Sequence, residues 1–251
     1  MNITGNTILI TGGGSGIGRA LAEALHKAGN QVVIAGRRET LLNEVTSANP
    51  GMEALLLDIQ DKDDVAAFAR QAVESFPALN VVIHNAGIMR SEAVAAGDFL
   101  ATAEDTIATN LLGPIRLTAA LLPHLLKQER AAILTVSSGL AFVPLASTPT
   151  YSATKAAIHS WSMALREQLK ATPVEVIEIA PPYVQTELLG PQQAVDPAAM
   201  PLAEFTSEVM TLLENAPASG EIIVERCKPL RFAAENGQVG AIFAQLAAQH
   251  G

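Results

Sequence analysis

The residues of this chain that are best suited to acid–base chemistry are a tyrosine, a lysine and a serine. Tyr151 and Lys155 are four positions apart, and helix residues with this spacing lie on one face. A phenol normally ionises near pH ~10, so it exchanges protons near neutrality only if a neighbouring positive charge favours its anion. Lys155 would supply that charge. Ser138, thirteen residues upstream of Tyr151, would donate a hydrogen bond to the same substrate oxygen. The alternative is that Tyr151 and Lys155 form an exposed pair without function, since this spacing also arises by chance.

A glycine cluster near the N-terminus is the second feature with chemical meaning. It lies between a short apolar run and a helix-type pattern, and its residues are Thr11, Gly12, Gly13, Gly14, Ser15, Gly16, Ile17 and Gly18. Glycines allow a sharp turn and close approach to a phosphate, and the amides at a helix N-terminus bind an anion. The cluster therefore predicts a pyrophosphate site. A flexible loop without a ligand is the alternative, and the spacing G-x-x-x-G-x-G differs from the commoner G-x-G-x-x-G.

Two arginines follow the second strand-type run. Gly36, Arg37 and Arg38 stand where sites for the non-phosphorylated dinucleotide place an Asp or Glu that binds the ribose hydroxyls. Gly36 offers no such group, whereas the guanidinium forks of Arg37 and Arg38 suit a 2′-phosphate. A solvated arginine pair, with Glu39 neutralising one member, is the alternative. We predict a preference for NADP(H), with NAD(H) as the second choice.

The segments that must position these residues alternate between two patterns. Strand-type runs are predicted at 7–11, 31–35, 53–57, 80–84, 131–136 and 174–179. Helical periodicity is predicted at 17–28, 40–48, 61–76 and 152–171, with one long helix or two between 99 and 127. Such alternation favours a parallel sheet. We expect residues 1–251 to form a single α/β domain, built on a doubly wound parallel sheet with helices on both faces.

Composition and charge limit the classes of protein that fit. The 251 residues are 49% apolar and 16% charged, which supplies a large core and argues against disorder. The formal net charge of −9 would repel a phosphate backbone, so we expect no nucleic-acid partner.

Cysteine, histidine and apolar-run patterns limit the chemistry further. Cys227 is the only cysteine, so we expect no intrachain disulfide. The five histidines are scattered without ligand spacing, so we expect no metal site. No apolar run approaches the ~18 residues of a membrane span, and no basic region precedes the first apolar run. A cytoplasmic, soluble protein without membrane contact is the expectation.

Several separate motifs agree in order and spacing with one known family. They are the loop from Thr11 to Gly18, Asp58, Asn85-Ala86-Gly87, Asn110, Ser137-Ser138, Tyr151 to Lys155, and Pro181 with Val184 and Thr186. Over about residues 6–186 the chain resembles a short-chain dehydrogenase/reductase of the single-domain Rossmann type. Each motif is weak alone, and the combination is highly specific.

The resemblance implies a role for each matched residue. Tyr151 would be the acid–base residue, Lys155 would bind the nicotinamide ribose and favour the tyrosinate, and Ser138 would polarise the substrate oxygen. Asn110 would hold a water in line with Lys155. The implied cofactor contacts are Thr11, Gly12, Gly14, Ser15, Gly16, Ile17, Gly18, Arg37, Arg38, Asp58, Ile59, Asn85, Ala86, Gly87, Tyr151, Lys155, Pro181, Val184 and Thr186.

Some of these residues have simpler readings when they are taken singly. Asp58 would serve as a helix cap, Asn110 as a polar residue on a helix surface, and Thr186 as a turn hydroxyl. Ser137 is the nearest rival of Ser138, which we prefer because its spacing to Tyr151 matches the family.

The sequence departs from the family pattern at three places. His84 stands where a second asparagine is common, and Pro182 replaces a glycine, so that Tyr183 is expected to lean towards the substrate. The usual seventh strand is not evident. The chain instead ends in a segment from Glu221 to Phe232 and a predicted helix at about 238–249, an ending similar to the DltE-like subgroup.

A substrate lid is expected at about 187–217. The apolar residues available to line it are Leu188, Leu189, Val195, Met200, Leu202, Phe205, Val209 and Met210. The alternative is that these residues only close a small core of their own.

Together these features predict an NADP(H)-dependent oxidoreductase that interconverts a small-molecule carbonyl compound and a secondary alcohol. The family suggests a homodimer or homotetramer built by helices around 104–126 and 152–171. A non-catalytic dinucleotide-binding redox sensor is the main alternative. A methyltransferase on a similar sheet would not explain the segment from Tyr151 to Lys155 or Arg37.

Overall fold

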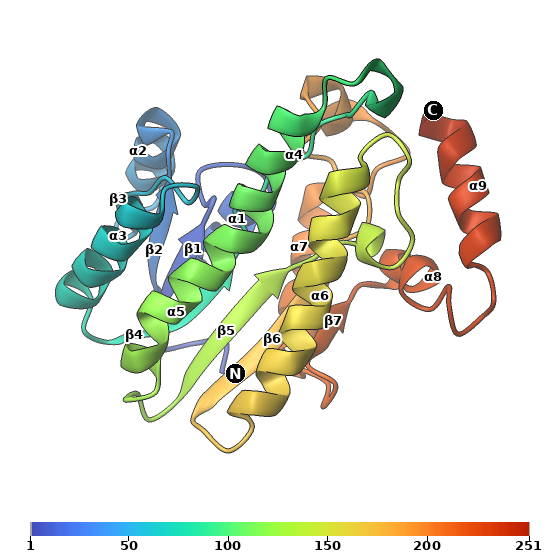
Figure 1. The fold of residues 1–251 in the computed structure, drawn as a ribbon. Coiled ribbons are helices and arrows are strands. Elements are labelled where there is room, and N and C mark those ends of the chain that lie inside the picture. Colours follow the sequence, from blue (N-terminus) through green and yellow to red (C-terminus); the bar gives the residue numbers. More distant parts are fainter. Residues whose placement is uncertain (1, 251) are drawn as a thin grey trace.

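The computed structural model describes residues 2–250 and centres on a seven-stranded parallel sheet (Figure 1). The strands are β1 Thr7–Thr11, β2 Gln31–Gly36, β3 Glu53–Leu56, β4 Leu79–His84, β5 Ala131–Val136, β6 Val174–Ala180 and β7 Glu221–Ile223. They lie in the order β3-β2-β1-β4-β5-β6-β7, and the chain reverses direction across the sheet between β1 and β4. The predicted doubly wound parallel sheet is confirmed. Residues 1 and 251 of the predicted domain lie outside the described residues.

Helices cover both faces of the sheet. On one face α1 Gly16–Lys27, α2 Glu39–Ala48 and α7 Leu202–Glu214 pack, and on the other α3 Lys62–Ser75, α5 Gly113–Leu125 and α6 Pro149–Leu169. Adjacent residues of a strand alternate between the two cores, with Ile8 and Ile10 facing α1 while Leu9 faces α3 and α5. Because both faces are covered, the strands read as nearly continuous apolar runs.

The segment between 99 and 127 is a helix with an inserted π turn. It consists of α4 Leu100–Ile107, the π turn Ala108–Leu112 and α5, so the predicted alternative of two helices is confirmed, with a π turn joining them. The π turn carries Asn110, and such turns occur often at functional sites. Within residues 2–250, no helix combines the length and the apolar character needed to cross a bilayer.

A seventh strand is present, contrary to the sequence-based expectation. β7 pairs with β6 in parallel, with Glu178 beside Glu221 and Ala180 beside Ile223. The strand has only three residues, too few to give a periodic pattern, and its position depends on pairing with a distant segment. After it the chain forms the short turn η5 Glu225–Cys227, then α8 Lys228–Arg231 and α9 Val239–His250. The predicted terminal helix is confirmed as α9.

The expected lid contains part of the main core. Phe205 and Val209 of α7 are fully buried and join the same core as α1, and Met200 lies there too. These residues therefore do not line a lid surface. Leu188, Leu189 and Val195, which precede α7, are exposed. Sequence patterns do not separate the two groups, since both are apolar and only packing against α1 distinguishes them.

We predict that Gly18→Ala destabilises the fold. A Cβ at Gly18 would lie 2.3 Å from Asn85 Nδ2 and 2.4 Å from the Gly12 carbonyl oxygen, so backbone must shift. Overpacking of this kind lowers the free energy of unfolding by about 1–3 kcal/mol, to be measured by urea denaturation. Gly240→Ala in α9 is the matched control, because an added Cβ there meets nothing within 4 Å and should stabilise the helix slightly. Equal stability of Gly18→Ala and wild type would contradict the packing described.

Candidate active site

A cleft of about 740 Å³ lies at the carboxyl ends of the strands, where the chain order across the sheet reverses. Its volume falls in the ordinary range of ligand pockets, and open α/β sheets bind ligands at this position. The predicted site residues that line it are Thr11, Gly12, Gly14, Ser15, Gly16, Ile17, Arg37, Arg38, Ile59, Asn85, Ala86, Gly87, Ser138, Tyr151, Lys155, Pro181, Val184 and Thr186.

Gly18, Asp58 and Asn110 do not belong to that lining. Gly18 lies behind the glycine loop, and Asp58 Oδ1 accepts a hydrogen bond from the Gln60 amide at 3.1 Å. Asp61, rather than Asp58, caps α3 by accepting from the amides of Asp63 and Asp64. Asp58 is thus left at the edge of the cleft, half exposed.

Asn110 is buried and its amide is bonded to the backbone after β4. Its Oδ1 accepts from the Ile88 amide at 2.9 Å, and its Nδ2 donates to the Ile88 carbonyl at 2.9 Å and to Thr154 Oγ1 at 3.3 Å. The π turn therefore holds the loop after β4 against the helix that carries Tyr151. A polar residue on a helix surface would not make these contacts.

The glycine loop is shaped by left-handed backbone and by bonds to the loop after β4. Gly12 and Gly16 have φ values of +70° and +53°, which side chains with a Cβ rarely adopt. Thr11 Oγ1 accepts from the amides of Asn85 and Ala86 at 3.1 Å, and Asn85 Nδ2 donates to the Thr11 carbonyl at 3.0 Å. The loop is held open at the N-terminus of α1, where the helix dipole favours an anion.

Both predicted arginines lie at the mouth of the cleft next to this loop. Arg38 Nη2 donates to Ser15 Oγ at 2.7 Å, so the Ser15 hydroxyl at the start of α1 is engaged by an arginine instead of a helix amide. Arg37 Nη1 lies 4.0 Å from Asp58 Oδ1, and its side chain is 49% exposed. Two guanidinium groups thus face the end of the cleft beyond the glycine loop.

Ser138, Tyr151 and Lys155 meet at the other end of the cleft. Ser138 Oγ accepts a hydrogen bond from the Leu140 amide at 3.1 Å, and the Ser138 hydroxyl lies close enough to the Tyr151 phenol to lower the pKa of that phenol. Ser137 is buried, and its hydroxyl points to the Ile179 carbonyl at 3.5 Å. Ser138 is therefore the serine that faces Tyr151, as its spacing predicted.

The acid–base properties of Tyr151 and Lys155 are dominated by burial. Lys155 Nζ donates to the Val136 carbonyl at 2.7 Å and lies 5.5 Å from the centre of the Tyr151 ring. Burial raises the pKa of Tyr151 to about 12, opposed by the Ser138 hydrogen bond, and lowers the pKa of Lys155 to about 8, opposed by the charge of Glu178. The pKa of Tyr151 is thus raised by desolvation, contrary to the expectation that Lys155 would lower it.

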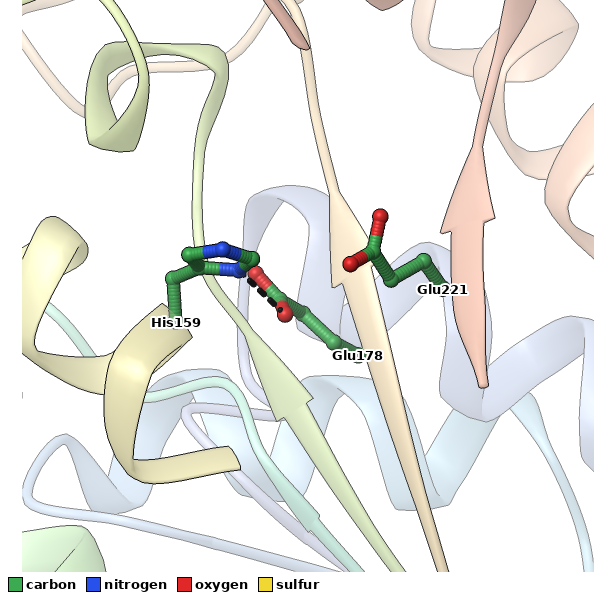
Figure 2. Close-up of side chains that lie close together, drawn as sticks. All are labelled: His159, Glu178 and Glu221. Carbon is green, nitrogen blue, oxygen red and sulfur yellow. Dashed lines mark hydrogen bonds and ion pairs between the residues drawn. The ribbon is translucent and has the colours of Figure 1, made fainter. Parts of the chain in front are cut away.

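A cluster of charged side chains follows Tyr151 and Lys155 along α6, and it consists of His159, Glu178, Glu221 and Arg231. Glu178 is fully buried and the other three are partly buried; Figure 2 draws His159, Glu178 and Glu221. Glu178 and Glu221 are register partners on β6 and β7, and Figure 2 shows the Glu178 carboxylate between the His159 ring and Glu221. His159 Nδ1 lies 2.8 Å from Glu178 Oε2. Arg231 binds both Glu221 oxygens, through Nε at 2.7 Å and Nη2 at 3.2 Å.

Sequence reasoning missed this cluster because its members are far apart in the chain. Two signals were available: Glu178 interrupts a buried apolar strand, and His159 follows Lys155 by four positions on one helix. Donor atoms of His159, Glu178 and Glu221 lie within 4.8 Å of one another, a spacing that a metal ion would accept. However, the Arg231 guanidinium donates hydrogen bonds to both Glu221 oxygens. The cluster is therefore arranged as two pairs, His159 with Glu178 and Arg231 with Glu221.

Comparisons with known proteins agree on one family. The family model of the short chain dehydrogenases matches residues 6–196. The uncharacterised oxidoreductase DltE of Bacillus subtilis (strain 168) is 47% identical over 189 residues, which cover 75% of each chain.

Solved structures give the same result. A short-chain dehydrogenase from Burkholderia cenocepacia J2315 in complex with NADP is 26% identical, with a TM-score of 0.82 and coverage of 98% of this chain and 99% of that one. A short-chain dehydrogenase/reductase from Burkholderia phymatum in complex with NAD has the same fold, with a TM-score of 0.83 at 20% identity and coverage of 96% of both chains.

We predict that His159→Ala lowers the free energy of unfolding by about 3 kcal/mol near pH ~6, because it leaves the buried Glu178 carboxylate without its partner. The hydrogen bond with Glu178 raises the pKa of His159 above its ordinary value of 6.5. The stabilisation is therefore fully present below that ordinary value and declines as pH rises through the folded-state pKa.

Urea denaturation across this pH range measures the effect. The double variant His159→Ala with Glu178→Gln is the control, and it should recover part of the loss because the buried charge is gone. A loss that does not change with pH would contradict the assignment of a charged His159.

Proposed function

The chain belongs to the short-chain dehydrogenase family, and we propose that it is an NADP(H)-dependent oxidoreductase that interconverts a carbonyl compound and a secondary alcohol. One observation carries the proposal: Ser138, Tyr151 and Lys155 converge at one end of a cleft whose other end is the glycine loop with Arg37 and Arg38. A single catalytic domain carrying both ends is the simplest arrangement consistent with the sheet.

The residues of the cleft fit a nicotinamide dinucleotide. The glycine loop before α1 lines the cleft, with Gly12 and Gly16 in left-handed backbone. A Cβ at Gly12 would reach 2.9 Å from Asn85 Nδ2, so glycine is needed where this loop packs against the loop after β4. The amides at the start of α1 then suit a pyrophosphate. Lys155 would bind the nicotinamide ribose, and Val184 and Thr186 would contact the carboxamide. Asp58 and Ile59 would contact the adenine. The B. cenocepacia and B. phymatum proteins, which hold NADP and NAD, support a dinucleotide without deciding between the two.

When bound, the nicotinamide ring supplies the hydride for reduction of the carbonyl carbon or accepts it from the alcohol. The chain's own part is to hold the substrate oxygen and to move one proton. Ser138 donates a hydrogen bond to that oxygen, and Tyr151 gives it the phenolic proton. A pKa of about 12 keeps the Tyr151 phenol protonated near neutrality, as a proton donor requires.

Lys155 and Asn110 complete the proton path in this proposal. The ammonium of Lys155, held on the Val136 carbonyl, stabilises the tyrosinate that remains after proton transfer. Asn110, joined to the same helix through Thr154, holds a water that returns a proton from bulk solvent.

Arg37 and Arg38 support the preference for NADP(H). They point to the end of the cleft where the adenosine ribose would lie, and Gly36 offers no carboxylate to bind its free hydroxyls. The 4.0 Å approach of Asp58 to Arg37 leaves the guanidinium with further donors for a 2′-phosphate.

An apolar substrate is consistent with the surroundings of Tyr151. Met89 and Leu145 pack against the Tyr151 ring, with Leu140 and with Leu246 of α9 beside them. Of the expected lid at 187–217, Leu188 and Leu202 line the cleft. The Tyr183 hydroxyl donates a hydrogen bond to Asp196 Oδ2 at 3.0 Å. Tyr183 is thus bonded to the segment 187–217, contrary to the expectation that it points towards the substrate.

We also propose a homodimer or homotetramer that uses the helices around 104–126 and 152–171. A shallow apolar groove between α4 and α6 supports this assembly, because a second copy of the chain would cover it. Its apolar lining residues are Val94, Phe99, Ile107, Leu111, Pro149, Ala153 and Ala157.

We predict that Tyr151→Phe lowers kcat for reduction of aldehydes and ketones by about 10²–10⁴-fold, because it removes the proton donor. Binding of NADPH, followed by calorimetry, should change little, since one hydroxyl is lost from a large cleft. Tyr183→Phe is the control and should retain turnover, because its hydroxyl bonds to Asp196 in the lid. Normal turnover by Tyr151→Phe would refute the mechanism.

We predict that Arg37→Ala weakens binding of NADPH by about 10–100-fold and leaves binding of NADH nearly unchanged, because only NADPH loses a charge-assisted hydrogen bond. Isothermal titration calorimetry with both dinucleotides measures the difference. Arg19→Ala, which removes an exposed arginine paired with Glu23 on α1, is the matched control. An equal loss for both dinucleotides would show that Arg37 does not read the phosphate.

A further inference from the structure

Glu178 is a buried carboxylate whose surroundings do not satisfy it fully. Its exposed fraction is 0%, and it sits on β6 among apolar residues. Oε2 is bonded to His159, while Oε1 has no hydrogen-bond partner within the described residues. A buried charge with an unsatisfied oxygen reduces stability, so a role beyond packing is the simplest reason for a carboxylate at this position.

The register of the sheet places this carboxylate near Lys155. Glu178 is the β6 partner of Thr135 on β5, and Lys155 Nζ is bonded to the carbonyl of the next residue, Val136. Thr135 is bonded to Ser162 of α6 at 2.8 Å, so this face of both strands is the one that α6 covers. Glu178 and the ammonium of Lys155 therefore share the same interface between α6 and the sheet.

His159 fixes the carboxylate in that interface. Tyr151, Lys155 and His159 follow one another at intervals of four residues along one face of α6. The His159 ring is held in turn by an edge-to-face contact with Phe142, their centroids 4.8 Å apart, and the Arg231 guanidinium lies over the Phe142 ring. The carboxylate of Glu178 is thus positioned from the same helix that carries the acid–base pair.

We propose that Glu178, positioned by His159, is the buried counter-charge that keeps Lys155 protonated during turnover. Glu178 and His159 are positioning residues in this proposal, which rests on the proposed function because it assigns Lys155 a charged role in the reaction.

The groups that face the pair from other elements are consistent with this role. Lys155 is faced by Tyr151 and by Ser138, neither of which carries a charge near neutrality. Burial lowers the pKa of Lys155 to about 8, and the negative charge of Glu178 opposes that fall. Among the described residues, the charge that raises the pKa of Lys155 is therefore that of Glu178 on β6.

Glu178 and His159 are faced by groups of both signs. They are Glu221 on β7, Cys227 in η5, and Arg231 at the end of α8, which also binds Glu235. Burial raises the pKa of the Cys227 thiol to about 12, so Cys227 is neutral. Arg231 neutralises Glu221 directly. The hydrogen bond with Glu178 raises the pKa of His159, so the imidazolium keeps its proton to a higher pH than usual. Once that proton is lost, the charge of Glu178 is no longer compensated by His159.

The test is Glu178→Gln, which keeps the shape of the side chain and removes its charge. Protonation of Lys155 is followed by NMR of protein labelled with ¹⁵N at lysine Nζ, with Lys155→Ala to assign the signal. We expect the midpoint of the Lys155 titration to fall by about one pH unit. The pH at which kcat for carbonyl reduction declines on the alkaline side should fall by the same amount. Activity near pH ~6, where Lys155 stays protonated, should remain within about twofold of wild type.

The matched control is Glu235→Gln, which removes an exposed carboxylate from Arg231 and should leave the midpoint unchanged. An unchanged Lys155 midpoint in Glu178→Gln would overturn the proposal, as would a loss of activity equal at every pH. If Glu178→Gln does not fold, His159→Gln provides the second test, because it keeps the Glu178 carboxylate. The midpoint of the Lys155 titration in this variant should equal or exceed that of wild type, and a lower midpoint would overturn the proposal.

The two proposals fail in different ways. Titration of Lys155 by NMR needs no substrate, so it tests the counter-charge even if wild-type protein reduces no carbonyl compound. Absence of turnover by wild type would refute the proposed function, and a fixed midpoint would refute the role of Glu178.

Discussion

The bond from the Lys155 ammonium to the Val136 carbonyl is the interaction on which the arrangement of the cleft depends. It joins the helix that carries the acid–base residues to the carboxyl end of β5, where Ser138 follows. Because Tyr151 is one turn away on the same helix, this bond also fixes where the phenol lies relative to the serine hydroxyl. The loops after β1 and β4 are tied together by Thr11 and Asn85, so the phosphate end of the cleft is held on the same sheet.

Burial then determines the chemistry that these groups perform. An ammonium in a dry site tends to lose its proton, and a phenol there tends to keep its own. The shifts of Lys155 and Tyr151, to about 8 and about 12, follow this rule and suit a phenol that donates a proton. The same burial makes Lys155 sensitive to any fixed charge nearby, which is why the position of Glu178 on the adjacent strand has consequences for the active site.

Much of this structure could be predicted from the sequence because the signals are local. The glycine loop, the two arginines and the tyrosine–lysine pair each lie within a few residues, and alternating apolar runs fix the parallel sheet. The features that sequence reasoning missed depend on pairing between distant segments. β7 has three residues and is defined by its register with β6, and Phe205 and Val209 are core residues only because α7 packs on α1. Likewise, His159 and Glu178 are nineteen residues apart and meet only where α6 crosses β6.

A calorimetric titration of the wild-type protein with NADPH and NADH tests the cofactor site most directly, since it needs no knowledge of the substrate. We expect one NADPH to bind per chain and NADH to bind more weakly. Preference for NADH would contradict only the assignment of Arg37 and Arg38, next to Gly36, to a 2′-phosphate. Binding of neither dinucleotide would contradict the central claim that the cleft is a cofactor site leading to Tyr151.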